Sequence, residues 1–140
     1  MITIDTTTRR GQLIQIYSDF YKSAYGFRPR GINYHEFTLE ELEADFEVFD
    51  RVCAENRREE EEMRSRAIAE FEARVQSIID MGANDRKTAL RWIVESYEEH
   101  DLWYGAEGIV WNLGIGFCDY GRELEAELKP IIADHMAKVA

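Results

Sequence analysis

The sequence predicts an all-α protein, a helical bundle of about five helices in which one helix is unusually long. The chain of 140 residues contains only two prolines and nine glycines, so few positions interrupt a helix. Apolar residues recur every three or four positions, and β-branched runs of strand length are scarce. With 45% hydrophobic residues, the chain can bury a core. We expect a single all-α domain over residues 1–140, with helices at about 8–25, 38–80, 85–100, 103–113 and 119–138.

The first helix is indicated by apolar residues at helical spacing after a polar start. Gly26 is a natural C-terminal stop because glycine adopts the left-handed conformation that ends many helices. Pro29 disfavours a helical conformation at Arg28, so residues 27–37 read as an ordered connection. The apolar positions of this helix include Leu13, Ile16, Tyr17, Phe20, Tyr21 and Ala24.

The second helix begins with a capping box, in which Thr38 caps the backbone and Glu41 reaches back, and Phe37 and Leu42 form the matching hydrophobic staple. Its apolar stripe runs to Cys53 and resumes at Ala67, and nothing breaks the helix before Gly82. Between the two stripes lies "ENRREEEEM", residues 55–63, which is charged but compatible with helix. We predict one helix of about 43 residues with a solvated middle. A break into two helices near Asn56 is the alternative.

The C-terminal half predicts shorter helices. Asn84 or Asp85 caps the third, whose apolar face is Ala89, Leu90, Trp92, Ile93 and Tyr97. The fourth is expected to bury Trp103, Ile109, Val110, Trp111 and Leu113. A turn at Gly114 to Gly116 follows, and Asp119 is expected to cap the last helix. Pro130 lies within that helix and should kink or divide it.

Negative charge is concentrated in one part of the chain. The formal net charge is −11. Residues 39–62 hold eleven Asp and Glu residues against three Arg, while residues 1–38 hold three acidic against five basic residues. A field of that sign repels nucleic acid and anionic membranes and attracts basic protein surfaces. We therefore expect no direct nucleic-acid binding and no membrane binding.

Targeting signals and cysteine usage indicate the expected compartment. No apolar run approaches the ~20 residues that span a bilayer, and the N-terminus lacks the apolar segment of a secretory signal. Cys53 and Cys118 are far apart in sequence and form no CxxC motif, so both are expected to be reduced thiols. These observations predict a soluble, cytoplasmic protein.

The motifs of common catalytic and metal sites are missing. No Glu-x-x-His pair, HExxH motif, dinucleotide fingerprint or Walker loop is present. We expect no enzyme activity, catalytic residue, cofactor or metal. One alternative is a small enzyme that uses Cys118, which precedes a helix N-terminus, a position that can lower a thiol pKa. A buried structural thiol is the simpler interpretation.

Two further groups of residues each have two interpretations. Arg28 and Arg30 could bind an acidic patch or a phosphate as a secondary basic contact, or pair with the protein's own carboxylates. Aromatic residues of the C-terminal half could line a ligand pocket, although their helical spacing favours the core or a subunit interface. These aromatic residues are Trp92, Tyr97, Trp103, Tyr104 and Trp111.

The acidic stretch of the long helix is the candidate partner-binding site. It could be a solvated face, with Arg57 and Glu61, Arg58 and Glu62, and Glu60 and Arg64 paired at i, i+4. It could also imitate the phosphates of a duplex, at about half their axial density. The residues assigned to the site are Glu40, Glu43, Asp45, Glu47, Asp50, Glu55, Glu59, Glu60, Glu61 and Glu62.

Two segments, "YSDFYKSAYGFRPRG" and "ALRWIVESYEEHDLWYGAEGIVWNLGI", resemble small acidic proteins of bacteriophages and other mobile elements. The matching parts cover about a third of the chain. The resemblance implies that this is a protein of a bacteriophage or another mobile element. Small acidic proteins of such elements include inhibitors of host restriction and CRISPR systems. It identifies no catalytic residue.

Together these observations favour a non-enzymatic accessory protein that acts by protein–protein interaction. Its expected partner is a basic host protein or nucleic-acid-handling complex, to which it presents its acidic helix. A self-associating scaffold protein, such as a homodimer, is the alternative, in which the stripes Leu39 to Cys53 and Ile68 to Ile79 pack against another copy.

Overall fold

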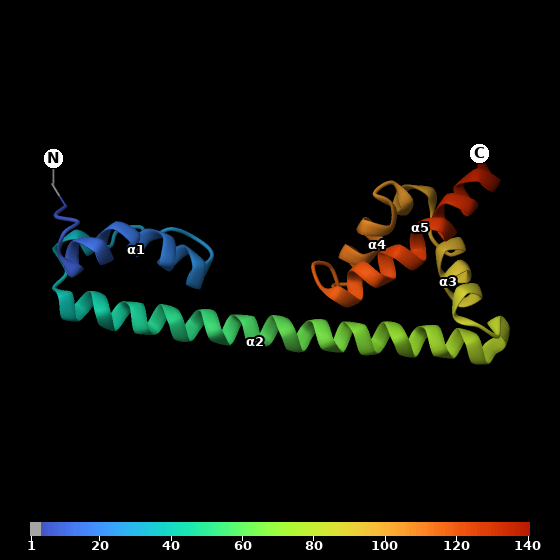
Figure 1. Cartoon of the computed structure of the whole chain (residues 1–140), viewed down its shortest axis with the longest axis horizontal. Helices are drawn as coiled ribbons and strands as arrows, with labels where there is room; N and C mark the ends of the chain where they lie inside the picture. The colour runs from blue at the N-terminus through green and yellow to red at the C-terminus, as the bar shows by residue number, and fades with distance from the viewer. Residues whose placement is uncertain (1–3) are drawn as a thin grey trace. The chain divides into compact units, whose positions relative to one another are not determined.

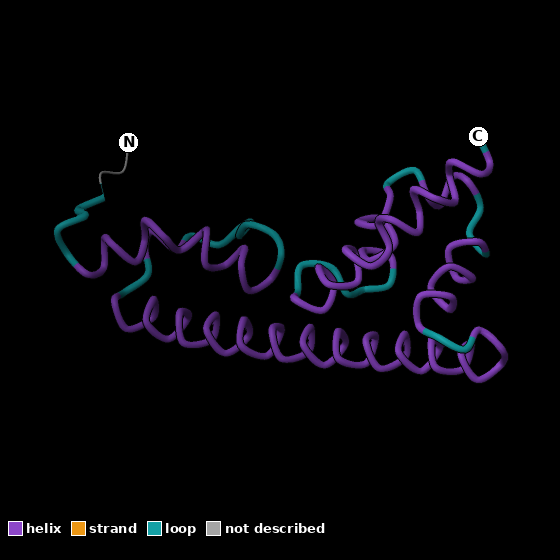
Figure 2. The backbone as a smooth tube through the Cα atoms, turned by 45° about the vertical axis from the view of Figure 1, so that its right-hand side comes forward, coloured by secondary structure: helices purple, strands orange, loops and turns teal. Residues whose placement is uncertain are grey.

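The computed structural model describes residues 4–140, and all of their regular structure is helical (Figure 2). One of the five α-helices is much longer than the others (Figure 1), so the predicted all-α fold is confirmed. The helices are α1 (Arg9–Tyr25), α2 (Leu39–Ile78), α3 (Arg86–Glu95), α4 (Gly105–Asn112) and α5 (Asp119–Val139), and the short turns are η1 (Tyr34–Glu36), η2 (Ile79–Ala83) and η3 (Glu99–Leu102).

Helix α2 is continuous over 40 residues, so the alternative of a break near Asn56 is wrong. Its N-terminus is capped as predicted, because the Thr38 hydroxyl accepts a hydrogen bond from the backbone N–H of Glu41 at 3.2 Å. The helix passes directly into η2, a π-helical turn. Gly82, at φ 135°, adopts there a conformation that side chains disfavour and ends the helix near the predicted position.

The chain divides after Glu60 into two compact units, and each unit has its own cluster of buried residues. The sequence had suggested one domain with one core. The difference lies in the charged middle of α2, where no side chain from residue 54 to residue 63 is buried. The two apolar stripes of α2 therefore serve separate cores. We call residues up to Glu60 unit 1 and Glu61–Ala140 unit 2.

The core of unit 1 is centred on Tyr17, whose side chain is only 2% exposed. Its ring stacks on Tyr34 at 4.4 Å and meets Phe49 edge-on at 5.2 Å between ring centroids. Figure 1 shows how α1 runs beside the first part of α2 to form this core. The Asn56 side chain donates a hydrogen bond to the Ala24 carbonyl at 3.1 Å, which satisfies an acceptor in the last turn of α1.

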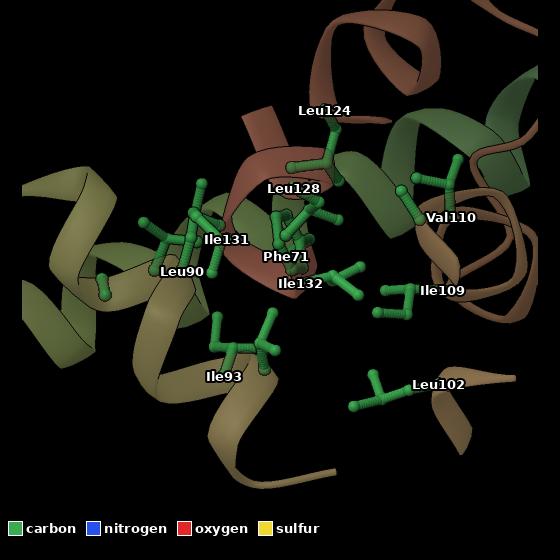
Figure 3. Packing of buried hydrophobic residues seen from close by; sticks show 14 of the residues in the cluster. Phe71, Leu90, Ile93, Leu102, Ile109, Val110, Leu124, Leu128, Ile131 and Ile132 are labelled. Atoms are coloured by element: carbon green, nitrogen blue, oxygen red, sulfur yellow. The ribbon is translucent and has the colours of Figure 1, made fainter. Parts of the chain in front are cut away.

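The core of unit 2 is formed by the second stripe of α2 together with α3, α4, α5 and the η3 turn (Figure 3). Leu128 of α5, which is 1% exposed, and Phe71 of α2 both belong to this cluster and are labelled near the middle of Figure 3. Residues from the other elements complete the cluster. They include Leu90 and Ile93 of α3, Leu102 of η3, and Ile109 and Val110 of α4.

The third helix is shorter than predicted, and this changes which residues are buried. Helix α3 ends at Glu95, and residues 99–102 form a separate turn capped by reciprocal hydrogen bonds between Glu98 and Asp101. Leu102 enters the core in place of Trp103, which is 74% exposed. Trp111 is also exposed, because α4 directs Ala106, Ile109 and Val110 to the core and Trp111 away from it. The predicted burial of Trp103 and Trp111 is wrong.

The last helix also differs from the prediction in two details. Cys118, rather than Asp119, is the N-cap of α5, and its sulfur accepts a hydrogen bond from the Gly121 N–H at 3.4 Å. The helix is not divided at Pro130 and continues to Val139. Pro130 is exposed, so the carbonyl that loses its helical donor can bond to water.

The separate cores predict separate unfolding of the two units. Leu42, which is fully buried in unit 1, should cost about 2–5 kcal/mol when changed to Ala. All three tryptophans lie in unit 2, so their fluorescence reports unit 2 alone. We expect Leu42→Ala to lower the midpoint of one part of the unfolding curve that is measured by helical circular dichroism. The unfolding transition measured by tryptophan fluorescence should stay unchanged.

The matched control is Leu124→Ala, which removes a side chain of the same type, 1% exposed, from unit 2. It should shift the fluorescence transition by a similar free energy. A single transition that moves in both variants would show that the chain unfolds as one cooperative domain.

Candidate functional site

Nine of the ten carboxylates assigned to the partner site are exposed along α2, and Asp45 is half-buried. At about 100° per residue, seven of them fall within an arc of roughly 140°. This arc lies opposite Leu42 and Phe49, which face the core of unit 1. We call this surface the acidic face. It consists of Glu40, Glu43, Glu47, Asp50, Glu55, Glu61 and Glu62.

The remaining three carboxylates do not belong to the acidic face. Asp45 points toward α1 and accepts a hydrogen bond from the Tyr17 hydroxyl at 2.7 Å. Burial, and then this bond, raises the pKa of Tyr17 above its ordinary value of 10.0. Glu59 and Glu60 are exposed on other sides of the helix. Asp45 therefore has a structural role within unit 1.

At its N-terminal end the acidic face is interrupted by no basic residue of α2. Glu40, Glu43, Glu47 and Asp50 follow one another at three- and four-residue spacing, and Glu43 pairs with Arg9 at 3.3 Å. Farther along, Arg51 and Arg58 also fall within the arc, so basic side chains interrupt the face there. The opening run of carboxylates is thus more continuous than "ENRREEEEM", which the sequence had made most conspicuous.

The predicted ion pairs along the middle of α2 are not formed in residues 4–140. The pairs at helical spacing in that range are Arg91–Glu95 at 3.7 Å and Asp119–Arg122 at 3.5 Å, and both lie outside α2. The side chains of the α2 middle therefore extend into solvent without fixing one another, and exposed pairs of this kind contribute little stability in any case.

The two candidate basic contacts differ in their surroundings. Arg28 donates hydrogen bonds to Asp19 at 2.7 Å and to the Ser18 hydroxyl at 3.0 Å. This is the self-pairing that the sequence offered as one interpretation. Arg30 is exposed.

Cys118 is engaged in the local structure of the α5 N-terminus. Besides accepting the Gly121 N–H, its thiol donates to the Ile115 carbonyl at 3.2 Å, and the residue is half-buried. The bond from Gly121 is that of a helix cap, and the bond to Ile115 joins the cap to the preceding turn. No cluster of three or more metal-ligating side chains is present among residues 4–140. Nor does any helix in that range have the length and apolar character needed to cross a bilayer.

A second surface, for which the sequence indicated only part of the lining, is a groove of about 770 Å³ in unit 2. Its aromatic residues are Tyr104, Trp111 and Phe117, which are 82%, 63% and 83% exposed. We call it the aromatic groove. Its remaining lining residues come from η3, α4, the following loop and α5: His100, Asp101, Glu107, Gly108, Asn112, Gly116, Arg122 and Glu125.

One glycine of the groove allows a close approach of Tyr104. A Cβ atom on Gly108 would come within 2.6 Å of the Tyr104 Cβ, whereas one on Gly116 would meet the Trp111 ring at an ordinary contact distance of 3.4 Å. The Trp111 and Phe117 rings meet edge-on with centroids 5.4 Å apart. The position of Tyr104 thus depends on the absence of a side chain at Gly108.

Phe117 has a backbone conformation that is unusual for its type. Its φ of 60° lies in the left-handed region, where a bulky residue costs about 1–2 kcal/mol relative to glycine. This strain places an apolar ring in solvent, so it gains no burial within the chain. Strained residues of this kind cluster at functional sites.

Carboxylates outnumber guanidinium groups in the aromatic groove. Asp101, Glu107 and Glu125 line it, against one arginine, Arg122, which is 3.5 Å from Asp119. The His100 ring lies within 3.4 Å of both Glu98 and Asp101. The groove therefore combines exposed aromatic faces with an excess of negative charge.

The position of α5, which supplies one wall of the groove, is fixed by Arg86. Its guanidinium bonds Glu127 of α5 at 2.7 and 3.1 Å and Glu72 of α2 at 2.9 and 3.0 Å, and Tyr120 also donates to Glu72. Hydrogen bonds to Glu127 and then Glu72 raise the pKa of Arg86. Burial alone would raise the pKa of Glu72, but the hydrogen bonds from Tyr120 and Arg86 outweigh it and hold that pKa below 4.5.

The sequence contained only part of the signal for this groove. Tyr104 and Trp111 are among the five aromatic residues that could line a pocket, although their helical spacing favours the core or a subunit interface. Phe117 and the acidic lining residues were not recognised as site residues. The spacing of Glu107 and Trp111, one turn apart on a single helix face, could have indicated that Trp111 shares a polar face.

Comparison with known proteins assigns no family to the chain, because no protein-family model, curated protein or solved structure matches it.

Arg86→Gln should destabilise unit 2 by about 1.5–3 kcal/mol, because it leaves Glu72 and Glu127 without their charged donor. Tryptophan fluorescence during urea unfolding measures this. Arg91→Gln is the matched control, since its exposed pair with Glu95 should contribute less than about 0.5 kcal/mol. The effect of Arg86→Gln should shrink as the pH falls below 4.5, because a carboxylate with a lowered pKa contributes only while ionised. Equal effects of the two substitutions would contradict the assigned role of Arg86.

Tyr120 should ionise at a higher pH than an ordinary tyrosine, whose pKa is 10.0. Burial and then its hydrogen bond to Glu72 raise the pKa of Tyr120 to about 12. In an absorbance titration of tyrosinate, Tyr120→Phe should remove one ionisation near that pH, and Tyr17→Phe should leave it in place. Because the folded-state pKa is raised, the stability contributed by Tyr120 is complete below pH 10.0 and declines as the pH rises toward 12. Loss of an ionisation near pH 10.0, instead of one near pH 12, in Tyr120→Phe would exclude this contact.

Proposed function

We propose that this chain is a non-enzymatic accessory protein that binds a basic protein surface through the acidic face of α2. The observation that carries the proposal is the row of exposed carboxylates opposite the packed side of the helix. A helix presents such a row at fixed spacing, and the field of the row raises the rate of encounter with a positive partner.

The partner that this surface fits best is the nucleic-acid groove of a host protein or complex. Such grooves bind phosphates through Lys and Arg side chains, and a row of carboxylates can occupy the same positions. The resemblance to small proteins of phages and mobile elements supports inhibition of a restriction or CRISPR complex in the bacterial cytoplasm. Affinity would depend on few anchors, with charge providing steering and register.

One observation weakens the alternative of a self-associating scaffold. The two apolar stripes of α2 that would pack against another copy are already used within the chain. Leu42 and Phe49 are buried in unit 1, and Phe71 and Val75 are buried in unit 2. A homodimer through these stripes would require both cores to open.

The test compares two variants with the same change in net charge. The face variant changes Glu47, Asp50, Glu55 and Glu61 to Lys, and the control variant changes Glu36, Glu70, Glu99 and Glu123 to Lys. All eight carboxylates are exposed, and none forms an ion pair within the described chain. Each tagged protein is used to capture partners from nuclease-treated bacterial lysate.

We expect the natural protein and the control variant to capture the same nucleic-acid-binding protein. The face variant should capture at least tenfold less of it. Added duplex DNA should displace the captured protein, because both compete for one groove. Capture should also weaken as salt is raised. Identical capture by both variants, or no competition by DNA, would contradict the proposal.

A further inference from the structure

The aromatic groove of unit 2 has the composition of a docking site for a cationic side chain. Its three aromatic rings are exposed, yet a folded chain usually buries side chains of this size. Phe117 is held in solvent by an unfavourable backbone conformation, and Gly108 leaves room for Tyr104.

The charge of the groove selects among possible occupants. An apolar helix laid on the rings would desolvate Asp101, Glu107 and Glu125 without pairing them, which is costly. A nucleic acid could stack its bases on the rings, but its phosphates would meet these carboxylates. A segment that carries arginine satisfies both features.

Arginine fits the groove in three ways. Its planar guanidinium stacks on an aromatic face, its paired N–H groups match a carboxylate, and its aliphatic stem packs against a ring. Trp111 and Phe117 offer the rings, and Glu107 and Glu125 offer carboxylates within the same lining. A volume of about 770 Å³ exceeds that of one side chain, so a peptide segment can enter.

We propose that the aromatic groove binds an arginine-containing segment of a partner protein, with the guanidinium between the rings of Trp111 and Phe117 and the carboxylates of Glu107 and Glu125. This site lies wholly in unit 2 and does not depend on the acidic face of α2. The proposal thus adds a second attachment point that has its own specificity.

The experiment uses a short peptide in which arginine alternates with serine, and a second peptide with citrulline in place of arginine. Citrulline keeps the shape of the side chain and removes its charge. Binding to the full chain is followed by the nuclear magnetic resonance signals of the tryptophan indole N–H groups. Trp92 lies outside the groove lining and serves as an internal reference.

We expect the Trp111 signal to shift saturably with the arginine peptide while the Trp92 signal stays in place. The citrulline peptide should bind at least tenfold more weakly. Equal binding of both peptides, or no shift of Trp111 at millimolar peptide, would overturn the proposal. A shift that depends on protein concentration without peptide would also overturn it, because a second copy of the chain would then occupy the groove.

Two substitutions distinguish a contribution of the Phe117 ring to binding from an effect on the fold. Phe117→Gly removes the ring and suits the left-handed backbone, so the fold is retained and peptide binding should fall at least tenfold. Phe27→Ala, which removes an exposed phenylalanine from unit 1, should leave binding unchanged. Unchanged binding by Phe117→Gly would exclude the role of the ring.

Charge is tested in the same manner. Glu107→Gln combined with Glu125→Gln should weaken binding, and Glu123→Gln, at an exposed position outside the lining, should not. Equal weakening by both would indicate a general charge effect and overturn the assignment. The face variant of α2 should still bind the peptide, so failure at the acidic face and failure at the groove give different results.

Discussion

The helical backbone of α2 must persist across ten residues that bury no side chain, and the rest of the architecture depends on this. Isolated helices are marginal in water, and most helices in proteins are stabilised by packing. Here the packing lies at both ends, where the stripes of α2 enter separate cores. Between them the chain relies on strong helix formers such as Glu, Arg and Met. The residue types of the middle are therefore constrained by helix propensity before any partner is considered.

The two candidate surfaces have different physical origins. The acidic face follows from the helical period, because carboxylates three and four residues apart share one side of α2. The aromatic groove follows from chain reversal, since α5 meets α4 only after the loop at Gly116 and Phe117 has turned. The acidic face attracts a charged partner over about one Debye length, whereas the aromatic groove binds only by direct contact.

Much of the secondary structure could be predicted from the sequence because its signals are local. The caps at Thr38 and Gly26, the stop at Gly82 and the apolar stripes all operate within one or two helical turns. The exposure of Trp111 had only one local signal, Glu107 one turn before it, because the face that α4 turns to the core depends on where this helix begins after the capped η3 turn. Arg86 was also missed as an organising residue, since its partners Glu72 and Glu127 are distant in sequence. The number of cores depended on whether charged residues inside a helix interrupt packing, which periodicity alone does not show.

The backbone of Phe117 has a consequence for how this sequence can change. Glycine would adopt the same φ without strain, and it would remove an exposed apolar ring. A selection for thermal resistance or solubility alone would therefore favour the loss of Phe117. Proteins that are optimised only for stability commonly lose activity at such positions. If the ring serves a partner, the stability optimum and the functional optimum of this loop are occupied by different amino acids.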